Sequence, residues 1–132
     1  MKKLDHIAIA VKDLNQSKDL FSKILNKVPE KIELIKEQDV RVCFYKLNNT
    51  KIELVESTKK TSVISKFIEK RGEGLHHISF EVNNIEIEKK RLTDLGFEIL
   101  ETSSKGANKT KVCFINPKQT NGVLIEMNEI NS

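Results

Sequence analysis

The amino-acid sequence predicts an α+β fold in which two copies of a βαβββ module form one curved mixed sheet. Two observations lead to this prediction: the chain repeats itself at a nearly constant spacing, and each copy carries the same order of strand and helix patterns. At 132 residues the chain has room for about one domain. We therefore expect one domain over residues 1–132, with module 1 at about 1–60, a linker helix at about 61–71 and module 2 at about 72–130.

The repeat is visible in three pairs of segments. In the first pair, leucine, histidine, isoleucine and valine recur at the same places after a shift of 71 residues, and the other two pairs give shifts of 70 and 73. The pairs are 4–14 with 75–85, 41–44 with 111–114, and 52–54 with 125–127. Three matches at almost one spacing indicate a duplicated supersecondary unit.

Each module opens with a strand followed by a helix. Apolar residues alternate over 7–11 and over 78–82, which is typical of a strand with one buried face. Asp13 and Asn84 are candidate N-caps, and the helices are expected to end near Pro29 and Gly96. The expected apolar face of the first helix consists of Leu14, Ser17, Phe21, Ile24, Leu25 and Val28.

Three short β runs complete each module. They are expected at about 32–36, 40–47 and 51–56 in the first module and at about 97–101, 110–115 and 122–128 in the second. Asn48-Asn49 and Asn116-Pro117 carry the residue types of turns between such runs. The two modules therefore have the same predicted order of elements.

The composition excludes several classes of function. The net charge is +4 with scattered basic residues, aromatic residues make up only 5% and Trp is absent, which argues against a nucleic-acid-binding surface. No apolar run approaches the roughly 20 residues that a membrane span needs, and no signal-peptide core follows Met1, so we expect a soluble cytoplasmic protein. Cys43 and Cys113 lack a Cys-x-x-Cys spacing and are expected to be reduced core residues.

Two histidines are placed on the open face of the sheet by the alternation of the strands. His6 shares a face with Ala8 and Ala10, whose small side chains are expected to leave room for a ligand. In the second module the alternation selects His77, whereas His76 is expected to share the opposite face with the strand's apolar residues. His6 and His77 are related by the repeat shift of 71 residues.

Two glutamates interrupt apolar strands at repeat-related positions. Glu53 and Glu126 alternate with apolar neighbours and are expected to face the same cavity as His6 and His77. A buried carboxylate is costly unless it is paired or bound to a metal. Imidazole and carboxylate together suit a divalent Fe, Co, Ni, Mn or Zn ion, with two coordination positions left open for substrate or water. We therefore predict a metal site of two histidines and two glutamates.

At these residues the sequence resembles the vicinal-oxygen-chelate, or glyoxalase, superfamily, and within it the methylmalonyl-CoA epimerase branch. The resemblance covers the whole chain, and its more specific parts are Gly-Leu-His-His at 74–77 and Gly-Val-Leu-Ile-Glu at 122–126. It implies the same four metal ligands, a homodimer, and interconversion of the C2 epimers of an acyl-CoA, methylmalonyl-CoA, through a metal-stabilised enolate. Val42 stands where some epimerases have a glutamate proposed as the base, and Asn116 where the branch often has histidine.

Inversion at C2 needs an acid or base on each face of a planar intermediate. Glu53 and Glu126 are the candidates for these catalytic roles, because the repeat places them on opposite sides of the site. Lys105-Gly106-Ala107-Asn108-Lys109 is a candidate lip for the phosphates of CoA, and Lys118 lies close to the strand of Glu126. An ordinary solvated hairpin loop explains this segment equally well.

Three alternatives remain open at the level of sequence. A glyoxalase I type isomerase would use the same ligand set on a glutathione hemithioacetal. A metal-free module that binds a drug would use the same fold, but the presence of all four ligand residues argues against it. An extradiol dioxygenase needs two histidines and one carboxylate, so the second glutamate disfavours it.

Overall fold

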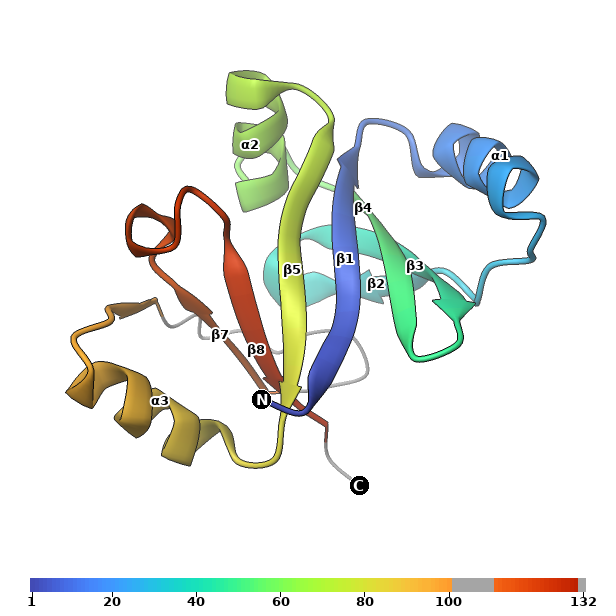
Figure 1. Cartoon of the computed structure of the whole chain (residues 1–132). Helices are drawn as coiled ribbons and strands as arrows, with labels where there is room; N and C mark the ends of the chain where they lie inside the picture. Colours follow the sequence, from blue (N-terminus) through green and yellow to red (C-terminus); the bar gives the residue numbers. More distant parts are fainter. Residues whose placement is uncertain (101–110, 131–132) are drawn as a thin grey trace.

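The computed structural model, which describes residues 1–100 and 111–130, contains one strongly curved eight-stranded sheet and three α-helices in that part of the chain (Figure 1). The elements are β1 (Lys3–Val11), α1 (Leu14–Leu25), β2 (Glu33–Ile35), β3 (Val40–Leu47), β4 (Thr50–Ser57), α2 (Val63–Arg71), β5 (Gly74–Val82), α3 (Ile85–Asp94), β6 (Ile99–Leu100), β7 (Lys111–Ile115) and β8 (Ile125–Glu129). Short 3-10 turns occupy Lys36–Gln38 and Pro117–Gln119. The predicted α+β class and the repeated βαβββ order are confirmed.

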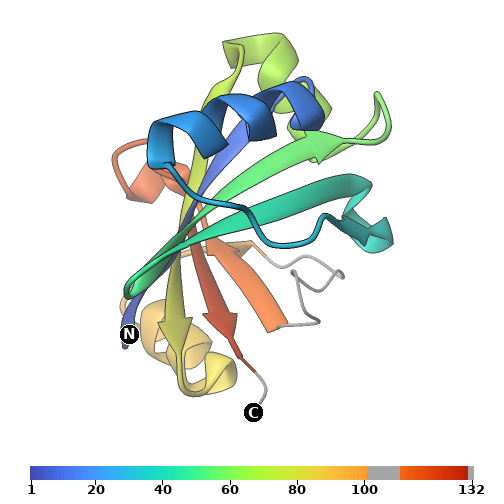
Figure 2. The ribbon, with the colours of Figure 1, turned by 90° about the vertical axis from the view of Figure 1, so that its right-hand side faces the viewer.

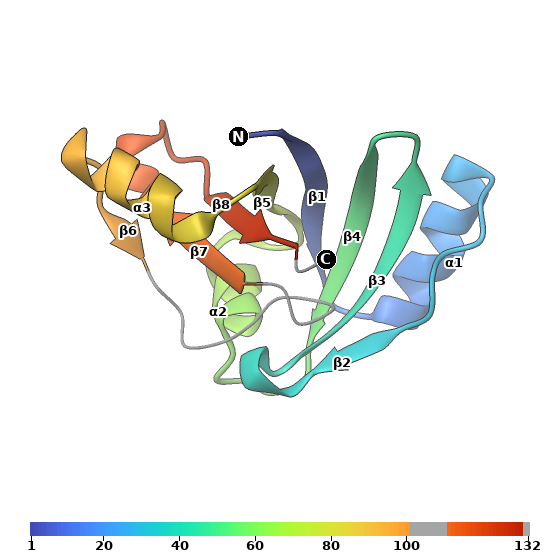
Figure 3. The same ribbon diagram turned by 90° about the horizontal axis from the view of Figure 1, so that it is seen from below.

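The repeat in the sequence corresponds to an approximate twofold symmetry of the sheet. The strands lie in the order β2-β3-β4-β1-β5-β8-β7-β6, so the two modules meet at β1 and β5 within one chain. β1 pairs with β4 in parallel, β5 pairs with β8 in parallel, and β1 and β5 run antiparallel. Viewed from below, both halves of the sheet bend toward the same side and form a half-barrel (Figure 3).

The two outer helices begin where their sequences predict. The side chains of Asp13 and Asn84 accept hydrogen bonds from backbone N–H groups of the first turns of α1 and α3. A second carboxylate supports each start: Glu56 accepts from Leu14 N at 2.9 Å, and Glu129 accepts from Ile85 N at 2.8 Å. Glu56 and Glu129 stand at equivalent places in β4 and β8. A hydrogen bond therefore links β4 to the N-terminus of α1, and an equivalent one links β8 to the N-terminus of α3.

The expected apolar face of the first helix is partly wrong. Ile24 is 65% exposed and Val28 is 92% exposed, whereas Phe21 and Leu25 pack on the core. α1 ends at Leu25 because Asn26 adopts a left-handed conformation with φ of 53°, and its N–H donates to the carbonyl of Ser22. The chain has therefore left the helix before Val28, three residues earlier than the position of Pro29 suggested.

The helices cover different faces of the sheet. α1 and α3 pack on the outer face of modules 1 and 2, as the view turned by 90° shows for α1 (Figure 2). α2 packs on the inner face, where Ile64 lies in one apolar cluster with Ala8 and Ala10. Both alanines are fully buried, so the expectation that they leave room for a ligand is wrong: their small side chains let α2 approach the sheet.

Several smaller expectations were also tested. Cys43 and Cys113 are buried and form no disulfide, as predicted. β8 begins at Ile125 and not near 122, because Asn121 and Gly122 form a turn with positive φ angles. β6 comprises only two residues in the described part of the chain. Among the described residues, the longest helices are too short and too polar to cross a membrane.

Removal of a core side chain tests the packing of module 1. Leu54 has no exposed surface and packs with Leu14 and Tyr45. We expect Leu54→Ala to lower the free energy of unfolding by about 2–5 kcal/mol, because it leaves a cavity in a closely packed cluster. The matched control Val28→Ala should change it by less than about 0.5 kcal/mol, measured by urea denaturation. Equal effects of the two substitutions would contradict the assigned core.

Candidate metal centre

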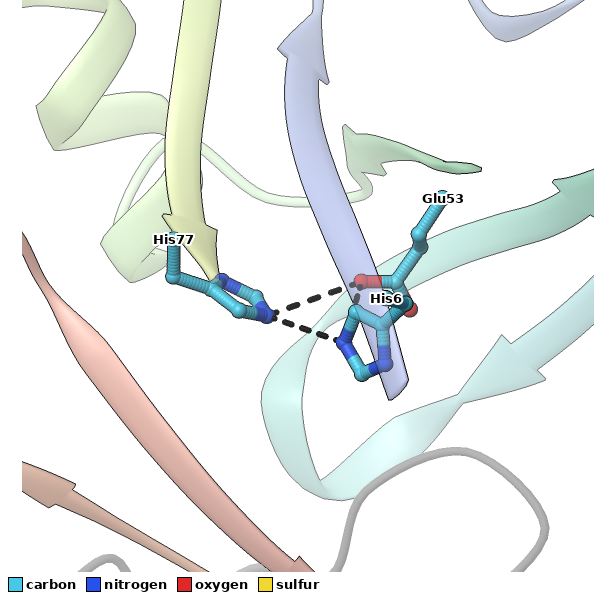
Figure 4. A group of neighbouring side chains, drawn as sticks. All are labelled: His6, Glu53 and His77. Carbon is cyan, nitrogen blue, oxygen red and sulfur yellow. Dashed lines mark hydrogen bonds and ion pairs between the residues drawn. The ribbon is translucent and has the colours of Figure 1, made fainter. Parts of the chain in front are cut away.

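Four side chains from four central strands converge on the inner face of the sheet. His6 of β1 and His77 of β5 bring their Nε2 atoms to 3.2 Å from each other. Glu53 Oε1 lies 3.6 Å from the first of these atoms and 3.8 Å from the second (Figure 4). Glu126 Oε1 lies at 3.4 and 3.8 Å from the same two atoms. The structure therefore places close together the four side chains that the repeat and the strand alternation had selected.

The register of the sheet explains this convergence. β4 places Glu53 opposite Ala8 of β1, and β8 places Glu126 opposite Ser79 of β5. Because these two pairings are related by the repeat, and because β1 and β5 run antiparallel, the glutamates approach the two histidines from opposite halves of the sheet. The centre therefore has approximate twofold symmetry within one chain.

Burial makes this group of charges unusual. The four side chains are each at most 10% exposed. Burial raises the pKa of Glu53 to about 7, and the nearby charge of Glu126 adds to this rise against the opposing effect of His6. Burial also raises the pKa of Glu126, although His6 and a hydrogen bond from Ser79 oppose the shift. Carboxylates in such surroundings need a cation or protons to balance them.

His6 is held by a residue that the sequence analysis did not single out. Its Nδ1 lies 2.8 Å from Asp5 Oδ2, so Nδ1–H donates to the carboxylate and Nε2 presents a lone pair to the centre. Burial opposes a positive charge on His6, but Asp5 and the two glutamates outweigh it and raise the pKa of His6. Asp5 is itself buried, and Lys51 Nζ lies 3.7 Å from its carboxylate. The sequence signal that could have identified Asp5 is its position directly before His6, a candidate metal ligand.

His77 is held by the neighbouring His76. Strand alternation placed His77 correctly on the inner face, but the prediction that His76 lies on the opposite face was wrong. His76 Nδ1 lies 2.8 Å from His77 Nδ1, and both rings line the same cavity. The cause is an irregularity in the β1–β5 register, where Ala8 pairs with His77 but Ile9 pairs with Leu75. His76 is thus the repeat equivalent of Asp5. Burial, His76 and His6 hold the pKa of His77 well below its usual value, which favours the neutral form.

The centre opens into a cavity of about 680 Å³. The walls near the four converging side chains are largely apolar, and they are formed by Val42, Phe44, Val55, Val112, Phe114 and Leu124. Val42, which stands where some epimerases have a glutamate, is buried in this wall. Lys118 is exposed in the 3-10 turn after β7, and the predicted lip at 105–109 lies outside the described residues.

The donor set fits a divalent ion of the first transition row. An ion about 2.0–2.2 Å from each donor places neighbouring donors roughly 3 Å apart, close to the spacing described above. One donor atom each from His6, Glu53 and His77 lies within 4.8 Å of the others, and Glu126 is in reach of both imidazoles. Two nitrogen and two oxygen donors are consistent with such a site.

Comparison with known proteins gives related sequences over nearly the whole chain. The chain is 36% identical over 130 residues to the uncharacterized protein YqjC of Bacillus subtilis, covering 98% of this chain and 93% of the relative. It is 34% identical over 131 residues to the ethylmalonyl-CoA/methylmalonyl-CoA epimerase of Cereibacter sphaeroides, covering 97% of this chain and 98% of the relative.

Comparison with solved structures and with protein-family models agrees with these sequence relatives. A structure of Streptomyces coelicolor methylmalonyl-CoA epimerase in complex with 2-nitronate-propionyl-CoA matches with a TM-score of 0.94 and 27% identity, covering 100% of this chain and 96% of that one. Residues 5–114 match the family model for the Glyoxalase/Bleomycin resistance protein/Dioxygenase superfamily. The chain therefore belongs to the glyoxalase/bleomycin resistance protein/dioxygenase superfamily and is related to methylmalonyl-CoA epimerases within it.

Proposed function

We propose that this protein is a metal-dependent epimerase that interconverts the two C2 epimers of methylmalonyl-CoA. The observation that carries the proposal is the convergence of two buried carboxylates and two buried imidazoles at the wall of a cavity of about 680 Å³. The names of the epimerase relatives support the choice of an acyl-CoA substrate.

His6, Glu53, His77 and Glu126 are the proposed ligands of the ion. Their Nε2 and Oε1 atoms face one another, and Asp5 and His76 fix the rings of the two histidines from behind. When bound, a divalent ion supplies positive charge that stabilises the oxygen of an enolate next to the thioester. The protein's part is to hold four donors in place at the wall of the cavity.

Glu53 and Glu126 are the proposed acid and base. They come from β4 and β8, which flank the β1–β5 pair on opposite sides, so each approaches one face of a planar intermediate. In the metal-free protein burial raises the pKa of both carboxyls, and coordination of a cation would lower the pKa of each again. One carboxylate removes the α-proton at an Oε atom, and the other carboxyl group delivers a proton to the opposite face.

The apolar wall completes the proposed site. Val42 and Val55 pair with each other across β3 and β4 and line the cavity, so neither of these two positions offers an acid or base. Such a wall accommodates the C2 methyl group and keeps water from the intermediate. Both proton transfers are accordingly assigned to the two glutamates.

Proton exchange at C2 tests the proposed activity. We expect the purified protein loaded with a divalent metal to exchange the C2 proton of methylmalonyl-CoA for deuterium in heavy water, observed by NMR. His77→Ala removes one metal donor and should abolish the exchange while the protein remains folded by circular dichroism. Metal binding without exchange would contradict the proposal in favour of a glyoxalase I type substrate, and absence of metal binding would favour a metal-free binding module.

Two conservative variants separate the roles of the carboxylates in the same assay. Glu53→Gln and Glu126→Gln each keep an oxygen donor but remove one proton carrier. Each variant should keep its metal and still exchange the proton of one epimer, but it should lose inversion. Full inversion in both variants would contradict the assignment of the two bases.

A change behind His6 tests the support of this ligand. Asp5→Asn should weaken metal binding by about 10- to 100-fold, because a neutral amide no longer orients and polarises the imidazole as a carboxylate does. The control Asp39→Asn changes another cavity-lining aspartate, which pairs with Lys59 and does not contact His6. Metal affinities are to be measured by titration with a competing chelator. Equal affinities of the two variants would contradict the role of Asp5.

The pKa of Glu53 predicts how metal binding depends on pH. Because burial raises this pKa to about 7, Glu53 is protonated below that pH in the metal-free protein, and the ion must displace the proton. Affinity should therefore fall by up to about tenfold per pH unit below about pH 7 and level off above it. Glu53→Gln should flatten the dependence. Constant wild-type affinity from about pH 5.5 to about pH 8.5 would contradict this expectation.

A further inference from the structure

A second cavity, of about 620 Å³, is lined by residues of α2 and of the turn that precedes β8. The two cavities share four lining residues, which are Val63, His76, His77 and Leu124. The two cavities therefore adjoin each other at the rings of His76 and His77. We call the second cavity the α2 groove.

The rim of the α2 groove is positively charged. Lys66, Lys70 and Arg71 line it and are exposed, against a single lining carboxylate, that of Glu69. In the described part of the chain no carboxylate lies within ion-pair distance of these three cations. The Arg71 guanidinium instead lies over the ring of Phe67, with its carbon 6.0 Å from the ring centroid.

This lack of partners differs from the situation on α3, which also carries three basic residues. On α3, Lys89 pairs with Glu86, Lys90 with Asp94 and Arg91 with Glu88. The charges of α3 are thus neutralised along its own surface, whereas those of α2 remain available to an anion. A surface with unpaired cations of this kind attracts a ligand of opposite charge.

The floor of the α2 groove is apolar. Leu75 is 69% exposed and Val123 is 43% exposed, and both line the groove with Phe67. Exposed aliphatic groups between a cationic rim and a reaction centre suit a ligand with an apolar arm and an anionic end. The same combination would not suit a small free anion, which has no use for the apolar floor.

We propose that the α2 groove binds the pantetheine arm and the phosphates of an acyl-CoA, with the thioester directed to the candidate metal centre. This inference rests on the proposed acyl-CoA substrate. The arm lies on Leu75 and Val123 and passes His76, and the phosphates contact Lys66, Lys70 and Arg71. The proposal commits to a CoA ester because the charged rim and the apolar floor belong to a cavity that adjoins the candidate metal centre.

Direct binding of coenzyme A tests this proposal without any reaction. Calorimetric titration of the metal-loaded protein should show binding of coenzyme A that weakens as salt rises from about 50 to about 500 mM, because the contacts to phosphates are screened. The double variant Lys66→Glu, Lys70→Glu should bind it at least about tenfold more weakly. Pantetheine, which lacks the nucleotide and the pyrophosphate, should bind both proteins with similar affinity.

A matched control makes the result specific to the groove. Lys23→Glu, Lys27→Glu changes the net charge by the same amount, and each pair includes a lysine of the last turn of a helix, α1 or α2. These two lysines line neither cavity, so coenzyme A should bind this variant as it binds the wild type.

Three results would overturn the inference. They are absence of coenzyme A binding by the wild type, equal loss of affinity in the two double variants, and a dimer in sedimentation that only the groove variant fails to form, which would assign the groove to a second copy of the chain. Proton exchange at C2 is not read in this titration. Failure of the epimerase assay with intact coenzyme A binding would therefore remove the proposed function alone.

Discussion

The antiparallel pairing of β1 with β5 is the interaction on which the rest of the structure depends. It joins the two modules into one sheet, and it alone brings His6 and His77 within 3.2 Å of each other. The parallel strands β4 and β8 then add one glutamate from each side. A shift in the β1–β5 register would separate the histidines while leaving each module's own pairing intact, so the site depends on this single pair of strands.

Much of the centre could be predicted because the signals that define it are local. The repeat identified the pairs of equivalent positions and strand alternation identified the face, so the convergence of His6, Glu53, His77 and Glu126 could be predicted from the sequence. The N-caps Asp13 and Asn84 were also correct, since capping depends on a few neighbouring residues.

What could not be predicted depends on contacts between distant parts of the chain. The bulge at His76 arises in the pairing of β5 with β1, and alternation within one strand cannot reveal it. The burial of Ala8 and Ala10 depends on α2 turning back onto the inner face. Asp5 is the exception, because it is adjacent to His6 in the sequence and its contact with the ring could have been considered from that position.

The approximate twofold symmetry is broken among the residues that neighbour the four converging side chains. Module 2 places Ser79 and Asn128, joined by a hydrogen bond of 2.6 Å, where module 1 has Ala8 and Val55. Asp5, an acid, likewise stands where module 2 has His76. A chelating ligand with two different oxygen atoms would bind a symmetric centre equally well in either of two orientations. In this centre the two orientations of such a ligand would meet different neighbours, Ser79 and Asn128 on one side and Ala8 and Val55 on the other, and would therefore differ in energy.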